Sequence, residues 1–249
     1  VGNEILPAKY YGSYVECNTE EISYDTGLAI KNVQDMVASD KYLFAGDVNT
    51  LYICSFDDEG TPIVISELSG FGSIRRMELS KDNNILIMAC REYGVFVVDI
   101  SDPNKPTIRS HIDTLELASG IDLVGNTLFI ASRYYGLEIY DITDPGNPVF
   151  YSAVKANEES ECIDCVAYGD YLYASVWATQ RVEIFEIKDI STPKYVGYIE
   201  TDGNAYGADI CNGNLVVATG FHSKINDSNN EQASGYATGN GISVYSLEN

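Results

Sequence analysis

An acidic residue recurs along the chain at intervals of 42 to 45 residues. The series consists of Asp35, Glu78, Asp122, Asp164 and Asp209. Five carboxylates around one axis would form a negative funnel that could bind a cationic ligand, or a hard cation such as calcium through oxygen ligands. Alternatively, each acid accepts hydrogen bonds from backbone amides of the neighbouring repeat. We favour this structural role and keep calcium as the cofactor that the series could hold.

A second series varies from copy to copy. Its members are Asp47, Arg91, Arg133, Trp177 and Gly220, and the loops after them add Glu92, Tyr93, Tyr134, Tyr135, Gln180 and Arg181. Aromatic faces and arginine forks beside acids suit a carbohydrate, a peptide or a small anion. The alternative is that Arg91 and Arg133 pair with acids of the next repeat. The ligand-binding candidates are Arg91, Arg133, Tyr134, Trp177, Arg181 and His222, with the single tryptophan as the strongest of them.

Two segments interrupt the repeat. The polar segment 222–239 has the composition of a partner-binding loop, and segment 17–34 could reach the same face. Oxygen-bearing side chains gather at 226–231, but they lack the spacing of an EF-hand loop.

Catalytic patterns are sparse. The chain has two histidines, His111 and His222, and it lacks a Ser-His-Asp pattern, a Walker loop, a glycine-rich dinucleotide turn and an HExxH motif. Asp35, Asp122 and Asp164 could provide an acid and a base for a glycan-active enzyme if their surroundings separated their pKa values. This enzyme is the alternative to a binding module.

The six cysteines give no clear site. Cys162 and Cys165 have CxxC spacing, but residues three apart on a regular strand point to opposite faces, so a zinc site is not expected. Cys54, Cys90 and Cys211 occupy strand positions typical of buried hydrophobic residues. We therefore expect free thiols, which weakens the argument for an oxidising compartment.

Composition excludes several classes of function. With 37 acidic and 15 basic residues the net charge is −22, which argues against nucleic acid and anionic membrane as partners. The 45% hydrophobic content is enough for a folded core, and no stretch is long and apolar enough to span a membrane. Since the chain begins at Val1 without a signal peptide, we expect it to be a trimmed part of its gene product.

An internal repeat defines the fold. The run Gly94–Pro106 recurs 42 residues later as Gly136–Pro148, with degenerate copies ending at Pro62 and Pro193. In one copy, four short apolar runs bounded by turn residues predict strands at 120–124, 128–132, 137–142 and 149–154. Four antiparallel strands in a unit of about 42 residues are typical of a β-propeller blade.

The spacing of the copies predicts five blades in one domain. The expected blades are approximately 33–71, 72–115, 116–157, 158–201, and 202–249 together with 1–16. The last copy lacks its fourth strand, and Leu6–Glu16 resembles Thr192–Glu200, so we expect the N-terminal strand to complete that blade and close the ring. Such closure removes exposed sheet edges.

The runs Gly94–Asp99 and Gly136–Asp141, each followed by Ser/Thr-Asp-Pro-x-x-Pro, resemble the bacterial LVIVD-repeat propellers. The resemblance is clear at 72–109 and 118–154, weaker at 160–201 and degenerate at 33–65. It implies a secreted or surface-attached β-propeller and supplies no catalytic residues. We expect an extracellular or cell-surface module that binds a glycan, peptide or protein on the loop face around the central channel.

Overall fold

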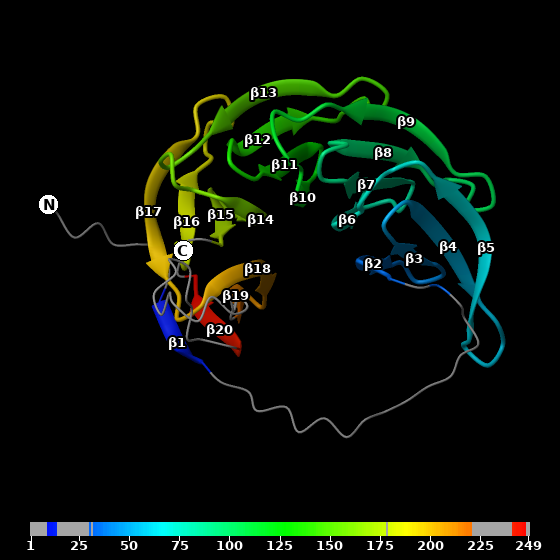
Figure 1. The fold of residues 1–249 in the computed structure, drawn as a ribbon, viewed down its shortest axis with the longest axis horizontal. Helices are drawn as coiled ribbons and strands as arrows, with labels where there is room; N and C mark the ends of the chain where they lie inside the picture. Colours follow the sequence, from blue (N-terminus) through cyan, green and yellow to red (C-terminus); the bar gives the residue numbers. More distant parts are fainter. Residues whose placement is uncertain (1–8, 14–29, 31, 178, 221–240, 248–249) are drawn as a thin grey trace, which may run out of the picture. The chain divides into compact units, whose positions relative to one another are not determined.

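The computed structural model describes residues 9–13, 30, 32–177, 179–220 and 241–247. Its regular elements within these ranges are all β-strands, and none is a helix that could cross a membrane. The strands form five four-stranded antiparallel sheets, labelled in Figure 1. Consecutive strands pair side by side in each sheet, as in a propeller blade.

The first sheet contains β2 (Asp35–Ala38), β3 (Leu43–Gly46), β4 (Thr50–Phe56) and β5 (Pro62–Ser69). The second contains β6 (Arg76–Leu79), β7 (Ile85–Ala89), β8 (Val95–Asp99) and β9 (Thr107–Ile112). The third contains β10 (Gly120–Val124), β11 (Thr127–Ser132), β12 (Gly136–Asp141) and β13 (Val149–Val154). The fourth contains β14 (Cys162–Tyr168), β15 (Tyr171–Val176), β16 (Arg181–Glu186) and β17 (Lys194–Glu200). The fifth contains β18 (Asn204–Cys211), β19 (Asn214–Gly220), β20 (Gly241–Ser246) and β1 (Lys9–Ser13).

The all-β class and the five-bladed β-propeller are therefore as expected from the repeat. In the third sheet, the observed strands differ from the predicted ones by one residue at most at each end. β1 pairs with β20, in register Lys9 to Ser246 and Ser13 to Ser243. The chain thus completes its last sheet with an N-terminal strand, while closure of a ring by that strand stays a prediction.

Contacts along the chain divide it into two compact units. The first unit is Val1–Glu16, Ala131–Ile139 and Tyr151–Asn249, and the second is Cys17–Ile130 and Tyr140–Phe150. The division runs through the third sheet and not between sheets. The expectation of a single domain, 1–249, stays a prediction, and each unit is described by itself below.

Apolar clusters lie between neighbouring sheets within each unit. In the second unit, Phe44 and Ile53 of the first sheet are buried in one cluster with Leu86 and Met88 of the second. In the first unit, Tyr173 of the fourth sheet shares a cluster with residues of the fifth, such as Leu215. Because neighbouring sheets cover each other, a central strand is buried on both faces, and burying each large apolar side chain contributes about 1.5–3 kcal/mol.

A repeated serine ties the outer strand of one sheet to the next sheet. Ser66, Ser110 and Ser152 each donate from Oγ to a backbone carbonyl of the following third-to-fourth-strand turn, at 2.5, 2.6 and 2.5 Å; the acceptors are Pro103, Pro145 and Ile190. In the first and second sheets this serine lies beside a β-bulge. Gly197 occupies the corresponding position in the fourth sheet, where no hydroxyl is available.

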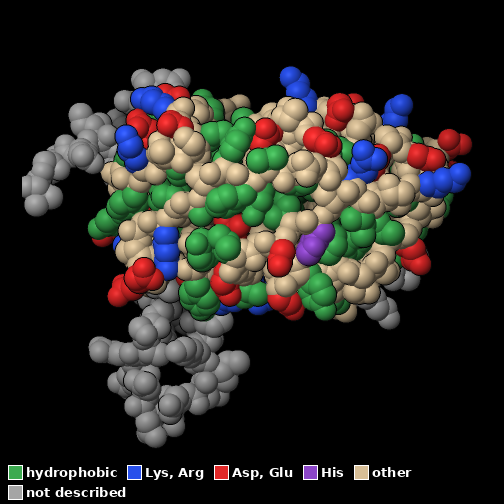
Figure 2. All heavy atoms as spheres, turned by 90° about the horizontal axis from the view of Figure 1, so that it is seen from above, with side chains coloured by type: hydrophobic (Ala, Val, Ile, Leu, Met, Phe, Trp, Pro, Cys, Tyr) green, Lys and Arg blue, Asp and Glu red, His purple; other side chains and the backbone are tan. Residues whose placement is uncertain are grey.

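The outer strands expose apolar side chains. Val149 and Phe150 of β13 are 49% and 48% exposed, and Ile63 of β5 and Ile108 of β9 are similarly exposed. Figure 2 shows hydrophobic side chains between scattered acids on the face that it views. The high net negative charge opposes association of such edges with one another.

The backbone conformation and surroundings of Gly136 leave no room for a larger residue. Its φ is +105°, and a Cβ there would lie 2.4 Å from the carbonyl oxygen of Val154. We expect Gly136→Ala to lower the free energy of unfolding by about 2–5 kcal/mol, since left-handed strain adds to a backbone clash. Urea unfolding measures this loss.

Gly125→Ala is the matched control. Gly125 also has a positive φ, +64°, but a Cβ there meets nothing within 4 Å. Its loss should be only about 1 kcal/mol. Equal losses at the two positions would contradict the clash with Val154.

Candidate functional site

Each sheet has two ends with different loops. We call the end that carries the hairpin between the second and third strands the loop end, and the end with the first hairpin and the third-to-fourth-strand turn the turn end. Arg91 and Arg133 begin loop-end hairpins with φ values of +50° and +26°. Arg91 exchanges backbone hydrogen bonds with Ala118, and the Arg133 carbonyl accepts from the amide of Cys162 at 3.0 Å. Each hairpin is therefore bonded to the next sheet, which fixes the backbone position from which its side chains extend.

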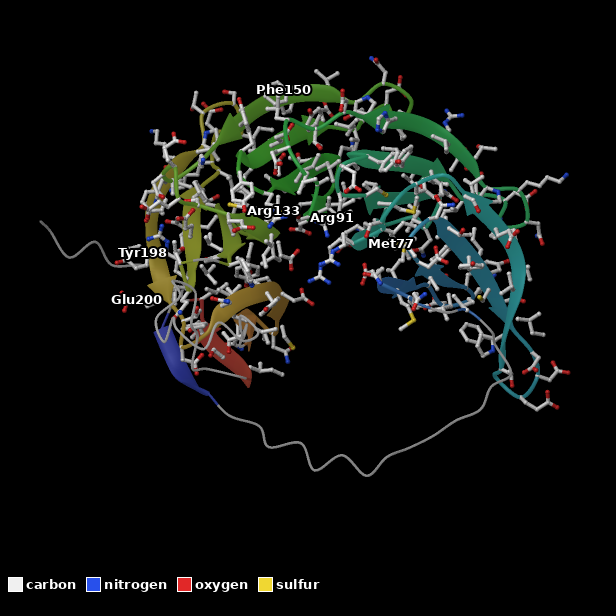
Figure 3. All side chains as sticks on the ribbon, viewed as in Figure 1. Met77, Arg91, Arg133, Phe150, Tyr198 and Glu200 are labelled. Carbon is white, nitrogen blue, oxygen red and sulfur yellow. The ribbon has the colours of Figure 1, made fainter. Side chains whose placement is uncertain are left out.

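Glu161 connects two of the predicted ligand-binding residues in the first unit. Its Oε1 lies 2.5 Å from Nε of Arg133, and its carbonyl accepts from the Trp177 amide at 3.2 Å. The Arg133 guanidinium carbon lies 4.9 Å from the ring centroid of Tyr134, which is 51% exposed. Arg133 is labelled in Figure 3. An aromatic face with a fixed cation beside it is thus open at the surface.

A second buried acid lies in the fourth sheet. The side chain of Glu183 is fully buried; its Oε1 accepts from Ser160 Oγ at 2.8 Å and lies 2.9 Å from an Arg181 nitrogen. The Arg181 guanidinium also lies 5.1 Å from the Tyr198 ring centroid, on the outer strand labelled in Figure 3. Burial raises the pKa of Glu183, against the opposing effects of Ser160 and Arg181. Its Oε2 has no hydrogen-bond partner in the described part of the chain.

Asn204 occupies, in the fifth sheet, the position that Glu161 has in the fourth. It pairs with Gly220, five residues after Leu215, just as Glu161 bonds to Trp177, five residues after Leu172. Asn204 is fully buried, and neither its Oδ1 nor its Nδ2 has a hydrogen-bond partner among the described residues. By the same count, Trp177 corresponds to Arg133. An ion pair at one position of the repeat is therefore replaced at the next by an indole and an unpartnered amide.

The recurrent acids do not share one level of their strands. Asp35 pairs with Gly46 and Asp164 with Ser175, each three residues after the leucine that begins the apolar run of the second strand, Leu43 or Leu172. Glu78 instead pairs with Ile87, only one residue after the corresponding leucine.

Asp209 shares the level of Glu78, since it pairs with Val216, one residue after Leu215. Asp122 lies on β10. The assumption that the five acids are equivalent is therefore wrong. Asp35 and Glu78 precede hairpins of unequal length, and Asp209 stands closer to its leucine than Asp164 does.

Two of these acids bond to the next sheet. Asp35 Oδ2 accepts from the Met77 amide at 2.7 Å, and Asp164 Oδ2 from the Ala208 amide at 3.2 Å. Burial raises the pKa of Asp35 despite this bond. These bonds match the structural role that we favour. No three His, Cys, Asp or Glu side chains of the described ranges are grouped so as to hold a metal ion, and the calcium site stays a prediction.

The remaining candidates are placed as follows. Nε of Arg91, in the second unit, lies 3.7 Å from the carboxylate of its neighbour Glu92. Arg181 pairs with Glu183, as described above. His222, segment 222–239 and nearly all of segment 17–34 lie outside the described residues. Ligand binding by these residues stays a prediction.

Sequence reasoning missed Glu161 and Glu183. Glu183 stands between Val182 and Ile184, as Glu138 stands between Leu137 and Ile139, and both glutamates are fully buried. An acid alternating with apolar residues usually marks a solvated sheet face. The missed signal was that central strands of a propeller blade have no solvated face, so an acid there needs a partner.

The cysteines correct two expectations. A bulge between Cys162 and Asp164 lets Cys162 pair with Val176 and Cys165 with Ala174, so the two thiols share one face and do not point to opposite faces. Cys211 is exposed, whereas Cys54 and Cys90 are buried as expected. The five described cysteines are free.

The fold and this loop end define a five-bladed β-propeller with a charged and aromatic hairpin end. Comparison with protein families matches the LVIVD repeat to residues 87–114 and 117–156. The chain thus carries LVIVD repeats in its second and third sheets, as the sequence resemblance implied. No curated protein matches the chain.

Solved structures resemble the chain in fold alone. A protein of unknown function from Desulfotomaculum acetoxidans shares 13% identity at a TM-score of 0.65, covering 77% of this chain and 64% of that one. A protein from Bacteroides uniformis, provisionally named a 6-phosphogluconolactonase, shares 15% identity at 0.64, covering 74% and 62%. The computationally designed Ika8 shares 12% at 0.60, covering 85% and 57%. The chain spans less than two thirds of the length of these structures.

Calcium should not stabilise the protein if the acids are structural. We expect the melting temperature in EDTA to equal that in excess calcium at matched ionic strength. A cation at 100 times its Kd would instead add roughly 2.7 kcal/mol, a rise on the order of 5–10 °C. Such a rise, abolished by Asp164→Asn or Asp35→Asn, would overturn the structural role.

Glu183 should make stability depend on pH. Because its pKa is raised above the ordinary value of 4.5, the folded protein holds this proton more tightly than the unfolded chain does. Stability from Glu183 is therefore present below pH 4.5 and is lost as the pH rises through the raised pKa. Glu183→Gln should lack this loss, so its stability relative to wild type should increase with pH. Urea unfolding from pH 4 to 8 measures the difference, and a constant difference would contradict it.

Proposed function

We propose that this chain is a binding module, working outside the cell or at its surface, whose ligand surface is the loop end in the first unit. Arg133, Tyr134 and Trp177 are its central residues, and Arg181 supports it. The ligand is a glycan, a peptide or a protein segment. Nucleic acid is disfavoured as a partner because the net charge of −22 repels phosphates.

The fixed cation over an exposed ring carries this proposal. Arg133 is held at Nε by Glu161, and its guanidinium lies over Tyr134, half of whose surface is open. Tyr135, next in the hairpin, is 47% exposed. Two aromatic rings beside an immobilised guanidinium can stack on a sugar or an aromatic side chain at little cost in conformational entropy.

Trp177 extends this surface. Trp177 is partly exposed, while the Asn204 amide is buried without a partner in the described ranges. The indole of Trp177 offers a further face on which a sugar or an aromatic side chain of a ligand can stack.

The pairing of the acids at this end supports binding over hydrolysis. Glu161 is paired with Arg133, and Glu183 with Arg181, so both of these buried carboxylates face a cation. The alternative, a carboxylate-dependent glycan-active enzyme, is supported by one kind of observation, the raised pKa of Asp35 and of Glu183. A general acid requires such a shift, but buried structural acids show it too.

Loss of the aromatic platform should abolish binding. The probes are a glycan array and a phage-displayed random-peptide library, screened with the wild-type chain. We expect Tyr134→Ala or Trp177→Ala to weaken the affinity for the selected probe at least tenfold. A central aromatic residue of an interface contributes more than about 1.4 kcal/mol, which corresponds to a factor of ten. Isothermal titration measures the affinity.

Tyr151→Ala is the matched control. Tyr151 lies on the outer strand of the third sheet, is 42% exposed and belongs to the same unit. Its variant should bind like wild type. If the wild-type chain retains no probe, or if all three variants lose affinity equally, the proposed surface is contradicted. Release of reducing sugar from a bound glycan would favour the glycan-active enzyme.

A further inference from the structure

A cavity opens at the turn end of the first and second sheets, away from the proposed ligand surface. Its volume is about 340 Å³, and it lies wholly within the second unit. Three turns line it, namely 39–42, 82–84 and 100–103. The volume falls at the lower end of the range for small-molecule sites, where a single sugar ring fits.

The walls of this cavity are held rigid by bonds within each turn. Asp82 accepts from Ser80 Oγ at 2.6 Å and from the Asn84 side chain at 2.8 Å, and Ser39 Oγ accepts from the Tyr42 amide at 3.1 Å. The Ile100 amide donates to the Asn84 carbonyl at 2.8 Å, which joins the second and third turns.

The third turn is also fixed from outside. The Pro103 carbonyl accepts the serine bond from Ser66 of the first sheet, so this turn is tied to the sheet that supplies the first turn. Few torsions remain to be ordered when a ligand enters, which lowers the entropic cost of binding.

Three polar side chains in this cavity are not used by the fold. Asp40, Lys41 and the hydroxyl of Tyr42 line the cavity, and among the described residues they form no side-chain hydrogen bond or ion pair. The Tyr42 ring packs against the apolar cluster of the first and second sheets. Its hydroxyl is therefore held at a fixed place and available.

The chemistry of the lining indicates the ligand. Phe44 and Ile100 form a buried apolar floor, and the rim carries two carboxylates, one ammonium, amides and hydroxyls. No single charge dominates, so a strongly charged ligand gains little. A rim of mixed donors and acceptors around a closed apolar base matches a sugar, whose hydroxyl groups both donate and accept hydrogen bonds.

We propose that this cavity, lined by Asp40, Lys41 and Tyr42 above Phe44 and Ile100, is a binding site for a neutral monosaccharide unit. Asp40 accepts hydrogen bonds from neighbouring hydroxyls, Lys41 donates to a ring or hydroxyl oxygen, and the Tyr42 hydroxyl does either. This site shares no residue with the proposed ligand surface, so the two proposals are independent.

Amide chemical shifts of the whole chain test this site. Glucose, galactose, mannose and N-acetylglucosamine are titrated singly, with choline as a cationic probe of similar size. At least one sugar should shift the amides of Lys41, Tyr42 and Asn84 in a saturable way. Asp40→Asn and Tyr42→Phe should each weaken that binding about three- to tenfold, the effect of losing one hydrogen bond to a ligand.

The fourth sheet offers matched controls. Tyr171 precedes Leu172 as Tyr42 precedes Leu43, and Asp170 stands in the same hairpin. Asp170→Asn and Tyr171→Phe should leave the affinity for the sugar unchanged, as should Trp177→Ala. Shifts with choline but with no sugar, shifts with none of the probes, or equal effects of test and control variants would overturn the proposal.

Discussion

Hydrogen bonds from one sheet to the backbone of the next are the interaction on which this molecule depends. A four-stranded sheet with two apolar faces is not stable alone, and apolar packing by itself does not fix how one sheet is set against another. Serine hydroxyls at the outer strands and aspartate carboxylates at the inner strands bond to carbonyls and amides of the following sheet. These directional bonds set the register, and the apolar clusters provide most of the free energy.

The same arrangement explains the charged residues at the loop end. Because neighbouring sheets cover both faces of a central strand, Glu183 has no solvent to stabilise its charge and is paired with Arg181. Glu161, at the edge of the same interface, is paired with Arg133. The loop end of the first unit therefore carries arginines whose positions are set by buried acids.

Most of the fold could be predicted from the repeat. The contacts of the candidate site could not. Prolines and glycines at a fixed interval located the turns, and strands alternating between those turns followed to within about a residue in the third sheet. Equating acids by their spacing failed, because the register of an acid depends on the length of the hairpin that follows it, and these hairpins differ in length. The partners Arg133 and Glu161 are 28 residues apart in the sequence and belong to different sheets, so no local pattern relates them.

The cavity between the first two sheets shows a further limit of sequence reasoning. Its residues come from three turns, and each turn has a sequence typical of turns in general. Only the assembled sheets show that some of their polar groups hold the turns and that, among the described residues, the side chains of Asp40, Lys41 and Tyr42 do not. Sequence patterns identify what a segment can form, and the folded chain shows which groups remain for other use.

Gly197 has a consequence for how the protein opens. In the first three sheets a hydroxyl bonds the outer strand to the following turn, and the fourth sheet has glycine there. The fifth sheet thus lacks this outer bond to the fourth. Its bonds to that sheet come instead from the Ala208 amide to Asp164 and from the Tyr245 hydroxyl to the Glu200 carbonyl, and the buried amide of Asn204 has no partner among the described residues. Local opening starts where the fewest bonds must break, so we expect the outer edge between the fourth and fifth sheets to open at a lower free energy than an edge held by such a serine bond.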